Sequence, residues 1–396
     1  MSLDPETETN VKEQDGRRSN SNGRGVDAVE SSSFIEDLIP NSFYTVFQQE
    51  KTFLLLVGSF FLLAAVTFPY PQIAMWVGFA FAGYSAIAND SIQTIGTFIA
   101  SNEDKKWWVL WLFIGIIFLA TVSYSWYVFD GDVSHQRLLA KGFSQQPDTF
   151  TFLQIAAPVF LLILTRMRMP VSTTFLLLSC FSASTAAIGS VLVKSLSGYL
   201  VAFVLAIVVW MIFTRTFSKY FVGKPHPAWA VAQWITSGSL WAVWIMQDAA
   251  NIAVYLPRSL SIGQFLGFAL FIFFGLGLLF YLRGDRIQRV VNEKSQVTDI
   301  RAATVIDFIY AIILYYFKAK SQIPMSTTWV FIGLLAGREI AMSFMDSQGH
   351  GKPLKKSLKL IGKDAGYAFI GLVVSIILAL SINPMIKDEI FKMIGF

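Results

Sequence analysis

The sequence is poor in charge: only 14% of its 396 residues are Asp, Glu, Lys or Arg, while 54% are hydrophobic. Soluble domains carry about 25% charged residues. The excess apolar side chains must therefore face lipid, and about ten to twelve membrane segments of about 20 residues each fit the length. A soluble enzyme, a nucleic-acid-binding module or a disordered scaffold is a poor interpretation of the chain as a whole. Its basic balance is better explained by membrane topology than by a partner surface.

Cysteine and histidine are nearly absent. The single cysteine, Cys180, excludes any disulfide within the chain. The three histidines, His135, His226 and His350, lie in polar stretches away from the apolar runs. A His/Cys metal centre, a Ser–His hydrolase or a haem-type electron carrier needs such residues inside the protein. We therefore expect neither an enzyme nor a bound cofactor.

Charge is also unevenly distributed along the chain. Residues 1–50 hold ten acidic and four basic side chains, and the remainder holds 16 acidic and 27 basic ones. The first 33 residues contain almost nothing to bury, which is typical of disorder. Residues 1–50 are therefore predicted to be a disordered acidic leader that ends in a short interfacial helix within 34–47.

Seven continuous apolar runs each have the length of a complete or nearly complete spanning helix. These runs cover residues 52–68, 107–128, 151–165, 195–216, 259–282, 303–317 and 365–385. Four further segments are apolar on average but are interrupted by polar residues, Gly or Pro: 72–101, 169–192, 229–258 and 323–345. Polar or irregular backbone at membrane depth is tolerated only where it is buried in protein or lines a cavity. The interrupted segments are thus predicted to carry the solute site.

Two short motifs in these interrupted segments occur twice, in the same order. Residues 88–93 (Ala-Asn-Asp-Ser-Ile-Gln) are followed by 170–174 (Pro-Val-Ser-Thr-Thr). Residues 246–251 (Met-Gln-Asp-Ala-Ala-Asn) are followed by 324–328 (Pro-Met-Ser-Thr-Thr). The repeat offset is 158 residues for the aspartates and 154 for the serines. Two unrelated motifs that keep nearly one offset indicate a duplicated architecture.

The predicted fold is an all-α polytopic membrane protein built from two matched halves. The first transporter repeat covers 51–217, a basic connecting loop covers 218–227, and the second repeat covers 228–396. Duplicated halves with broken or re-entrant helices at matching places are typical of secondary transporters. Hydropathy alone leaves open whether the halves are inverted relative to each other.

The acidic motifs offer ligands for a cation. Carboxylate and amide oxygens are hard ligands that suit a desolvated Na⁺, and a carboxylate in a membrane needs a cation or proton beside it. The predicted cation-binding residues are Asn89, Asp90, Asp248 and Asn251, with Na⁺ expected at the two aspartates. The amides of Gln93 and Gln247 can donate to an oxyanion, so they are assigned to substrate binding.

The Pro-x-Ser-Thr-Thr motifs offer the complementary chemistry. A proline at a helix start exposes free backbone N–H groups, and these form an anion cradle with the following hydroxyls. The predicted substrate-binding hydroxyls are those of Ser172, Thr173, Thr174, Ser326, Thr327 and Thr328. The competing interpretation is that each motif is a turn or an N-cap, or that its hydroxyls bond a neighbouring helix. For Asp307, a further acid in an apolar run, pairing between helices is favoured over an ion-site role.

These residues resemble the inorganic phosphate transporter family, the type III sodium/phosphate symporters and their bacterial relatives. That family carries a Gly-Ala-Asn-Asp-Val-Ala-Asn element and a Pro-x-Ser-Thr-Thr-His element in each half. Residues 88–97 and 247–251 resemble the first element, and residues 172–174 and 326–328 resemble the second. The resemblance implies two inverted repeats that move inorganic phosphate with Na⁺ or H⁺ through one central site. The family's two histidines are replaced here by Phe175 and Trp329.

The leading hypothesis is a cation-coupled inorganic phosphate symporter that works by alternating access. One alternative is a sulfate or other oxyanion permease, and another is a non-transporting membrane anion sensor of the same fold. We expect an integral, multi-pass protein of the cell (plasma or inner) membrane. Its expected partners are an oxyanion, a coupling cation and the lipid bilayer, with no nucleic acid, and a homo-oligomer is compatible with the sequence.

Overall fold

The computed structural model describes only part of the chain. It covers residues 43–140, 143–144, 146–167, 169, 171–182, 184–217, 223–282, 299–345, 354–383, 386–389 and 392. The chain divides into two units, residues 1–56 and residues 57–396. The first unit is described only from residue 43, where a helix begins, so nearly all of the predicted leader lies outside the described residues.

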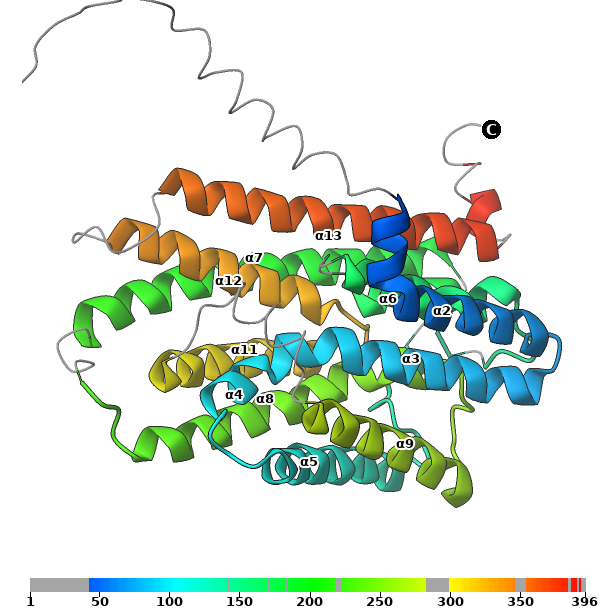
Figure 1. Cartoon of the computed structure of the whole chain (residues 1–396), viewed down its shortest axis with the longest axis horizontal. Helices are drawn as coiled ribbons and strands as arrows, with labels where there is room; N and C mark the ends of the chain where they lie inside the picture. The colour runs from blue at the N-terminus through cyan, green and yellow to red at the C-terminus, as the bar shows by residue number, and fades with distance from the viewer. Residues whose placement is uncertain are drawn as a thin grey trace, which may run out of the picture. The chain divides into compact units, whose positions relative to one another are not determined.

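All regular secondary structure among the described residues is helical (Figure 1). The α-helices are α2 (Phe43–Thr67), α3 (Pro71–Thr94), α4 (Gly96–Ser101), α5 (Trp107–Val128), α6 (Phe152–Arg166), α7 (Thr185–Phe217), α8 (Ala228–Ala253), α9 (Ile262–Tyr281), α11 (Ile300–Lys320), α12 (Thr327–Met345) and α13 (Leu354–Ile382). Short helical turns of other types are η1 (Arg137–Leu139), the π-helical η2 (Thr174–Leu178) and η3 (Ser179–Phe181). The predicted all-α fold is confirmed for this part of the chain.

Six helices in the described part are long and apolar enough to cross a membrane. They are Glu50–Thr67 of α2, α5, Thr185–Phe213 of α7, α9, α11 and α13. Helix α6 is apolar but shorter. Helices α3, α8 and α12, which carry the repeated polar motifs, are not among the six. These spans agree with an integral, multi-pass membrane protein.

Three of the four predicted interruptions coincide with breaks in helical structure. Helix α3 ends at Thr94 and α4 begins two residues later, at Gly96. Residues 171–184 form only η2, η3 and irregular backbone in their described part, and the residues before Thr327 are non-helical from Ser321 onward. Helix α8, by contrast, is continuous through Gln247, Asp248 and Asn251. Its polar side chains bond neighbouring elements, so its backbone keeps the regular helical ladder.

Local sequence explains where several helices begin. Helices α6 and α9 both start with a capping box. The side chain of the Ser or Thr accepts the backbone N–H of a Gln three residues on, and the side-chain carbonyl of that Gln accepts the backbone N–H of the Ser or Thr.

Pro158 lies inside α6 and has no N–H to donate to the backbone carbonyl of Gln154. The buried Tyr255 hydroxyl donates to that carbonyl at 2.8 Å. The missing helical bond is thus replaced by a contact that joins α6 to the segment after α8.

Helix α12 lies against α7, and α8 lies against α11 (Figure 1). Gly333 and Gly337, one helical turn apart, make the α12–α7 contact close. A Cβ at Gly333 would lie 2.4 Å from the carbonyl oxygen of Tyr199, and one at Gly337 would lie 2.2 Å from that of Phe203. Small residues four positions apart commonly allow such close approach in membrane helices. Helix α3 packs on α6, α8 and α9, which places Asp90 next to α8.

Candidate functional site

The first cluster of polar side chains surrounds Asp90 near the end of α3. We define this Asp90 cluster as Asp90, Asn89, Thr165 and Thr173. The Thr173 hydroxyl lies 2.9 and 2.8 Å from the two carboxylate oxygens, and Asn89 Nδ2 donates to Oδ1 at 2.8 Å. Thr165 donates to Asn89 Oδ1 at 3.1 Å. Both oxygens of the Asp90 carboxylate therefore have a donor, although its side chain is only 1% exposed.

The second cluster surrounds Asp248 near the end of α8. We define this Asp248 cluster as Asp248, Asn251, Gln247 and Thr174. Asn251 Nδ2 donates to Asp248 Oδ1 at 2.6 Å, and the Thr174 hydroxyl is 3.3 Å from the same oxygen. Gln247 turns to α11, where its Nε2 donates to the Leu314 carbonyl at 2.9 Å. Asp248 is as deeply buried as Asp90, at 2% exposed.

The four motif segments meet at one place. Thr173 and Thr174 are neighbours at the start of η2, yet the first bonds Asp90 and the second bonds Asp248. From the other half, the Thr328 hydroxyl donates to the Val171 carbonyl at 3.3 Å, and Asn89 donates to that same carbonyl. The two carboxylates are close enough to repel each other electrostatically. Buried like charges of this kind need a cation or a proton nearby.

The two serines of the motifs act as helix-start caps. The Ser172 hydroxyl accepts the backbone N–H of Phe175, and the Ser326 hydroxyl accepts that of Trp329, each three residues on. This is the hydrogen bond of an N-cap residue. The backbone N–H of Ser326 donates to the Ser195 hydroxyl at 2.8 Å. In this conformation, the competing N-cap interpretation describes both serine side chains.

Four buried side-chain oxygens near the carboxylates have no hydrogen-bond donor among the described residues. They are Gln93 Oε1, Gln247 Oε1, Asp248 Oδ2 and Asn251 Oδ1. Buried polar atoms are almost always partnered in folded proteins, so a group of such exceptions needs an explanation. Oxygens that have free lone pairs, with neutral amides around a carboxylate, suit a hard cation such as Na⁺. Three of the four oxygens belong to the Asp248 cluster.

The remaining predicted residues are also buried nearby. Thr327 lies within hydrogen-bonding reach of Asp248, and its carbonyl accepts the Tyr310 hydroxyl at 2.9 Å. The described contacts do not join the Gln93 amide to either cluster, although its side chain is only 8% exposed. Asp307 accepts Thr97 at 2.8 Å and Ser237 at 2.5 Å, so hydroxyls of α4 and α8 hold it.

The two aromatic residues at matched motif positions contact each other. The rings of Phe175 and Trp329 have centroids 5.4 Å apart with an interplanar angle of 48°. Phe175 is fully buried. An aromatic pair at this point makes the wall beside Thr174 and Thr328 apolar, and it brings the two Ser-Thr-Thr segments together from opposite halves of the sequence.

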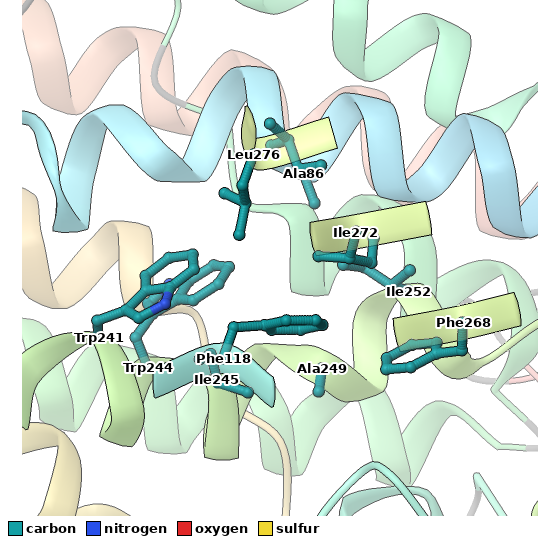
Figure 2. A pocket seen from close by; sticks show the side chains of 11 residues that line it. Ala86, Phe118, Trp241, Trp244, Ile245, Ala249, Ile252, Phe268, Ile272 and Leu276 are labelled. Atoms are coloured by element: carbon teal, nitrogen blue, oxygen red, sulfur yellow. The ribbon is translucent and has the colours of Figure 1, made fainter. Parts of the chain in front are cut away.

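Helix α8 separates this polar site from a small apolar cavity of about 20 Å³. Ile245, Ala249 and Ile252 face the cavity, together with Trp244 and residues of α3, α5 and α9 (Figure 2). Asp248 and Asn251 lie on the polar face of the same helix. A space of this size admits about one water molecule, and its lining offers almost no polar partner. The apolar cavity is therefore a packing defect between helices and has no room for an oxyanion.

Two contributors to the site had no signal in the sequence. Thr165 lies outside the motifs, and Arg137 is a single basic residue in a loop. Arg137 is completely buried and is close enough to Asp248 for their charges to interact. Burial lowers the pKa of its guanidinium to about 10, so the group stays charged at neutral pH. Burial lowers the pKa of the nearby His135 to about 4, so that ring is neutral there.

Comparisons with known proteins give one structural similarity. No family model matches the chain, and no curated protein matches it. Among solved structures, the chain is similar to one described as the sodium-dependent phosphate transporter. The similarity has a TM-score of 0.46 and 18% sequence identity, and covers 78% of this chain and 99% of the other.

Proposed function

We propose that the protein is a secondary active transporter that carries inorganic phosphate together with Na⁺ or H⁺ by alternating access. The observation that carries the proposal is the convergence of four motif segments, from both halves of the sequence, on two buried carboxylates. A buried carboxylate pair is expensive unless positive charge is bound between or beside its members. A coupling cation or proton supplies that charge and leaves again when the site opens.

The donor-free oxygens support a cation at the Asp248 cluster. Asp248 Oδ2, Asn251 Oδ1 and Gln247 Oε1 have lone pairs that no described donor uses. A bound Na⁺ satisfies such oxygens directly, whereas a proton satisfies only one of them. Na⁺ is therefore our first choice of coupling ion, with H⁺ as the second.

The threonine hydroxyls at the starts of η2 and α12 support an oxyanion beside the cation. Thr173 and Thr174 bond the carboxylates in this conformation, so they are cation-side groups until an anion competes for their protons. A bound cation would draw electron density from the carboxylates and release these hydroxyls. This exchange of partners is a physical basis for coupling cation binding to anion binding.

The packing of the helices supports two repeated halves that move against each other. Suppose that α3, α5 and α6 correspond to α8, α9 and α11, in that order. The contact of α3 with α6 then corresponds to that of α8 with α11, and the contact of α3 with α9 corresponds to that of α8 with α5. If α7 also corresponds to α13, and η2 to α12, the contact of α7 with α12 corresponds to that of α13 with η2. Matched contacts around one shared site are what rocking of one repeat against the other requires.

Uptake of radiolabelled phosphate by proteoliposomes tests the proposal. We expect accumulation driven by an inward Na⁺ gradient, and a smaller or no accumulation when choline replaces Na⁺ outside. A pH gradient without Na⁺ tests proton coupling in the same vesicles. Equal uptake by protein-free vesicles under every gradient would refute transport of phosphate.

A different oxyanion is the second candidate. The aromatic pair Phe175–Trp329 stands where the family that the motifs resemble has two histidines, so the site wall lacks those two polar groups. Competition of labelled phosphate uptake by sulfate, arsenate or molybdate separates the two. Stronger inhibition by sulfate than by unlabelled phosphate identifies a sulfate permease. Phosphate binding without any translocation identifies the non-transporting sensor.

A further inference from the structure

A second, larger cavity lies away from the carboxylates. It has a volume of about 590 Å³ and lies between the start of α7, the end of α11 and the non-helical linker that begins at Ser321. Lys194 and Lys320 line it, with the hydroxyl-bearing Ser190 and Ser197 on the same helix face as Lys194. No acidic side chain is among its described lining residues. It is an open groove and not an enclosed chamber, and its volume falls in the range of small-molecule sites.

The basic groups at this cavity are held in place by backbone carbonyls. Lys194 Nζ donates to the carbonyls of Ser321 and Ile323, at 3.1 and 2.5 Å. Arg137 Nη1 donates to the same Ser321 carbonyl, and its Nε is 3.5 Å from the Met246 carbonyl. Two cations that share one acceptor lie within two hydrogen-bond lengths of each other. Their charges repel, and Lys318 adds a third interacting positive charge.

Neither Arg137 nor Lys194 has a carboxylate within ion-pair distance among the described residues. Among the described residues, the acidic group whose charge interacts with Arg137 is Asp248, at longer range. Arg137 Nη2 is buried and has no described hydrogen-bond partner. The ammonium of Lys194 has three donors and uses two of them on carbonyls. Concentrated positive charge with donors to spare attracts an anion.

The cavity also adjoins the carboxylate site through the chain itself. The linker that Lys194 and Arg137 hold runs from Ser321 directly into the Ser326–Thr328 motif. Ser195, next to Lys194, accepts the backbone N–H of Ser326. Arg137 bonds Met246, one residue before Gln247. An anion bound in the cavity therefore lies beside a linker that continues, within a few residues, into the proposed substrate-binding segment Ser326–Thr328.

We propose that Lys194 and Lys320, with the buried Arg137 behind them, form an oxyanion-binding vestibule where inorganic phosphate binds before it reaches the Asp248 cluster. The proposal rests on the proposed function for its ligand. The vestibule raises the local concentration of the oxyanion, so it sets the half-saturating concentration of phosphate more than the maximal rate. Asp90 and Asp248 act at the later, coupled step.

Transport kinetics of three lysine variants test the vestibule in the full-length protein. Lys320 and Lys363 are matched: each has Nζ 5.5 Å from the centroid of a tyrosine ring four residues away, Tyr316 and Tyr367, but only Lys320 lines the cavity. We expect Lys194→Gln and Lys320→Gln to raise the half-saturating phosphate concentration, Lys194→Gln about tenfold, which is the loss of one charge-assisted hydrogen bond. Lys363→Gln is expected to match the unsubstituted protein. Unchanged half-saturation in both cavity variants would overturn the vestibule.

A binding measurement separates this proposal from the proposed function. The purified protein is treated with trinitrobenzenesulfonate, an anionic amine reagent, and modification at each lysine is followed by mass spectrometry. We expect phosphate to slow modification of Lys194 and Lys320 but not of Lys363, and chloride at equal ionic strength to leave all three unchanged. Protection without uptake means that the vestibule exists and the transport proposal fails. Uptake with no protection means the reverse.

Discussion

The Asp90 cluster and the Asp248 cluster contain the same kinds of side chains, but their oxygens are hydrogen-bonded to different extents. Both Asp90 oxygens accept the Thr173 hydroxyl within 2.9 Å, and one also accepts Asn89. The two hydrogen bonds to Asp248 are both on Oδ1, the longer of them at 3.3 Å; Thr327 lies within reach of the carboxylate, but Oδ2 has no hydrogen bond among the described residues. Repeated motifs have therefore produced one satisfied carboxylate and one incompletely satisfied carboxylate.

The difference indicates which cluster can bind a cation in this conformation without breaking existing hydrogen bonds. A cation at the Asp90 cluster must compete with hydroxyl and amide donors that already occupy the oxygens. At the Asp248 cluster, the free lone pairs of Asp248, Asn251 and Gln247 need no rearrangement first. Unsatisfied buried oxygens also cost free energy in the empty protein, so binding there recovers that cost. We infer that the Asp248 cluster binds the coupling cation first.

Neutralising either carboxylate is the strongest test, because the proposed function assigns both to the coupled step. We expect Asp90→Asn and Asp248→Asn each to reduce phosphate uptake by up to about a hundredfold, since a hydrogen-bonded charged group contributes up to about 3 kcal/mol. Both substitutions keep the size of the side chain, and monodisperse purified protein checks folding. Retained uptake in both variants would show that the carboxylates are misassigned.

The effect of Na⁺ on the unfolding temperature distinguishes the two clusters experimentally. At a Na⁺ concentration of about 100 times its Kd, binding stabilises a protein by about 2.7 kcal/mol. We expect Na⁺ to raise the unfolding temperature of the protein and of Asp90→Asn, but not that of Asp248→Asn. Scanning fluorimetry in detergent, with choline at equal ionic strength as the control, measures this. Loss of the Na⁺ effect in Asp90→Asn alone would reverse the order of binding.

The carboxylates and hydroxyls of the site were predictable because the bilayer makes them conspicuous. Asp90 and Asp248 stand inside apolar segments, where a charge is expensive, and their spacing matches that of Ser172 and Ser326. The structure brings these segments together. That they bind a cation and an oxyanion, and the individual roles of the hydroxyls, are still predictions.

Other features depend on three-dimensional packing that the sequence does not encode locally. The π-helical turn at Thr174 directs two adjacent hydroxyls to different carboxylates, and no propensity distinguishes Thr173 from Thr174. Arg137 reaches the site from a loop about 110 residues before Asp248 in the chain. The continuity of α8 was also not expected, because polar side chains that find tertiary partners need not interrupt a helix.

Removing one hydroxyl from each cluster is expected to have a smaller, unequal effect on stability. Thr173→Val leaves Asp90 Oδ2 without its only described donor, which costs about 1–3 kcal/mol. Thr174→Val removes a hydroxyl that lies 3.1 Å from the Met325 carbonyl and 3.3 Å from an Asp248 oxygen that Asn251 still satisfies, which costs about 0.5–1.5 kcal/mol. Valine keeps the shape of threonine in both cases. Equal unfolding temperatures for the two variants would contradict the difference between the clusters.

The aromatic pair offers the smallest effect, because it borders both clusters without bonding either carboxylate. Phe175 is fully buried, whereas Trp329 is partly exposed, so Trp329→His is the variant that the fold tolerates better. A neutral histidine there adds an acceptor beside Thr328 for the P–OH proton of phosphate, which sulfate lacks, and one such hydrogen bond is worth about two- to tenfold in affinity. Trp329→Phe keeps an aromatic ring against Phe175 and is the matched control. We expect the ratio of phosphate to sulfate affinity, measured by competition of uptake, to change by this factor in Trp329→His and to stay constant in Trp329→Phe. If both variants change this affinity ratio equally, the packing of the aromatic ring sets the selectivity, and the polarity of the site wall does not.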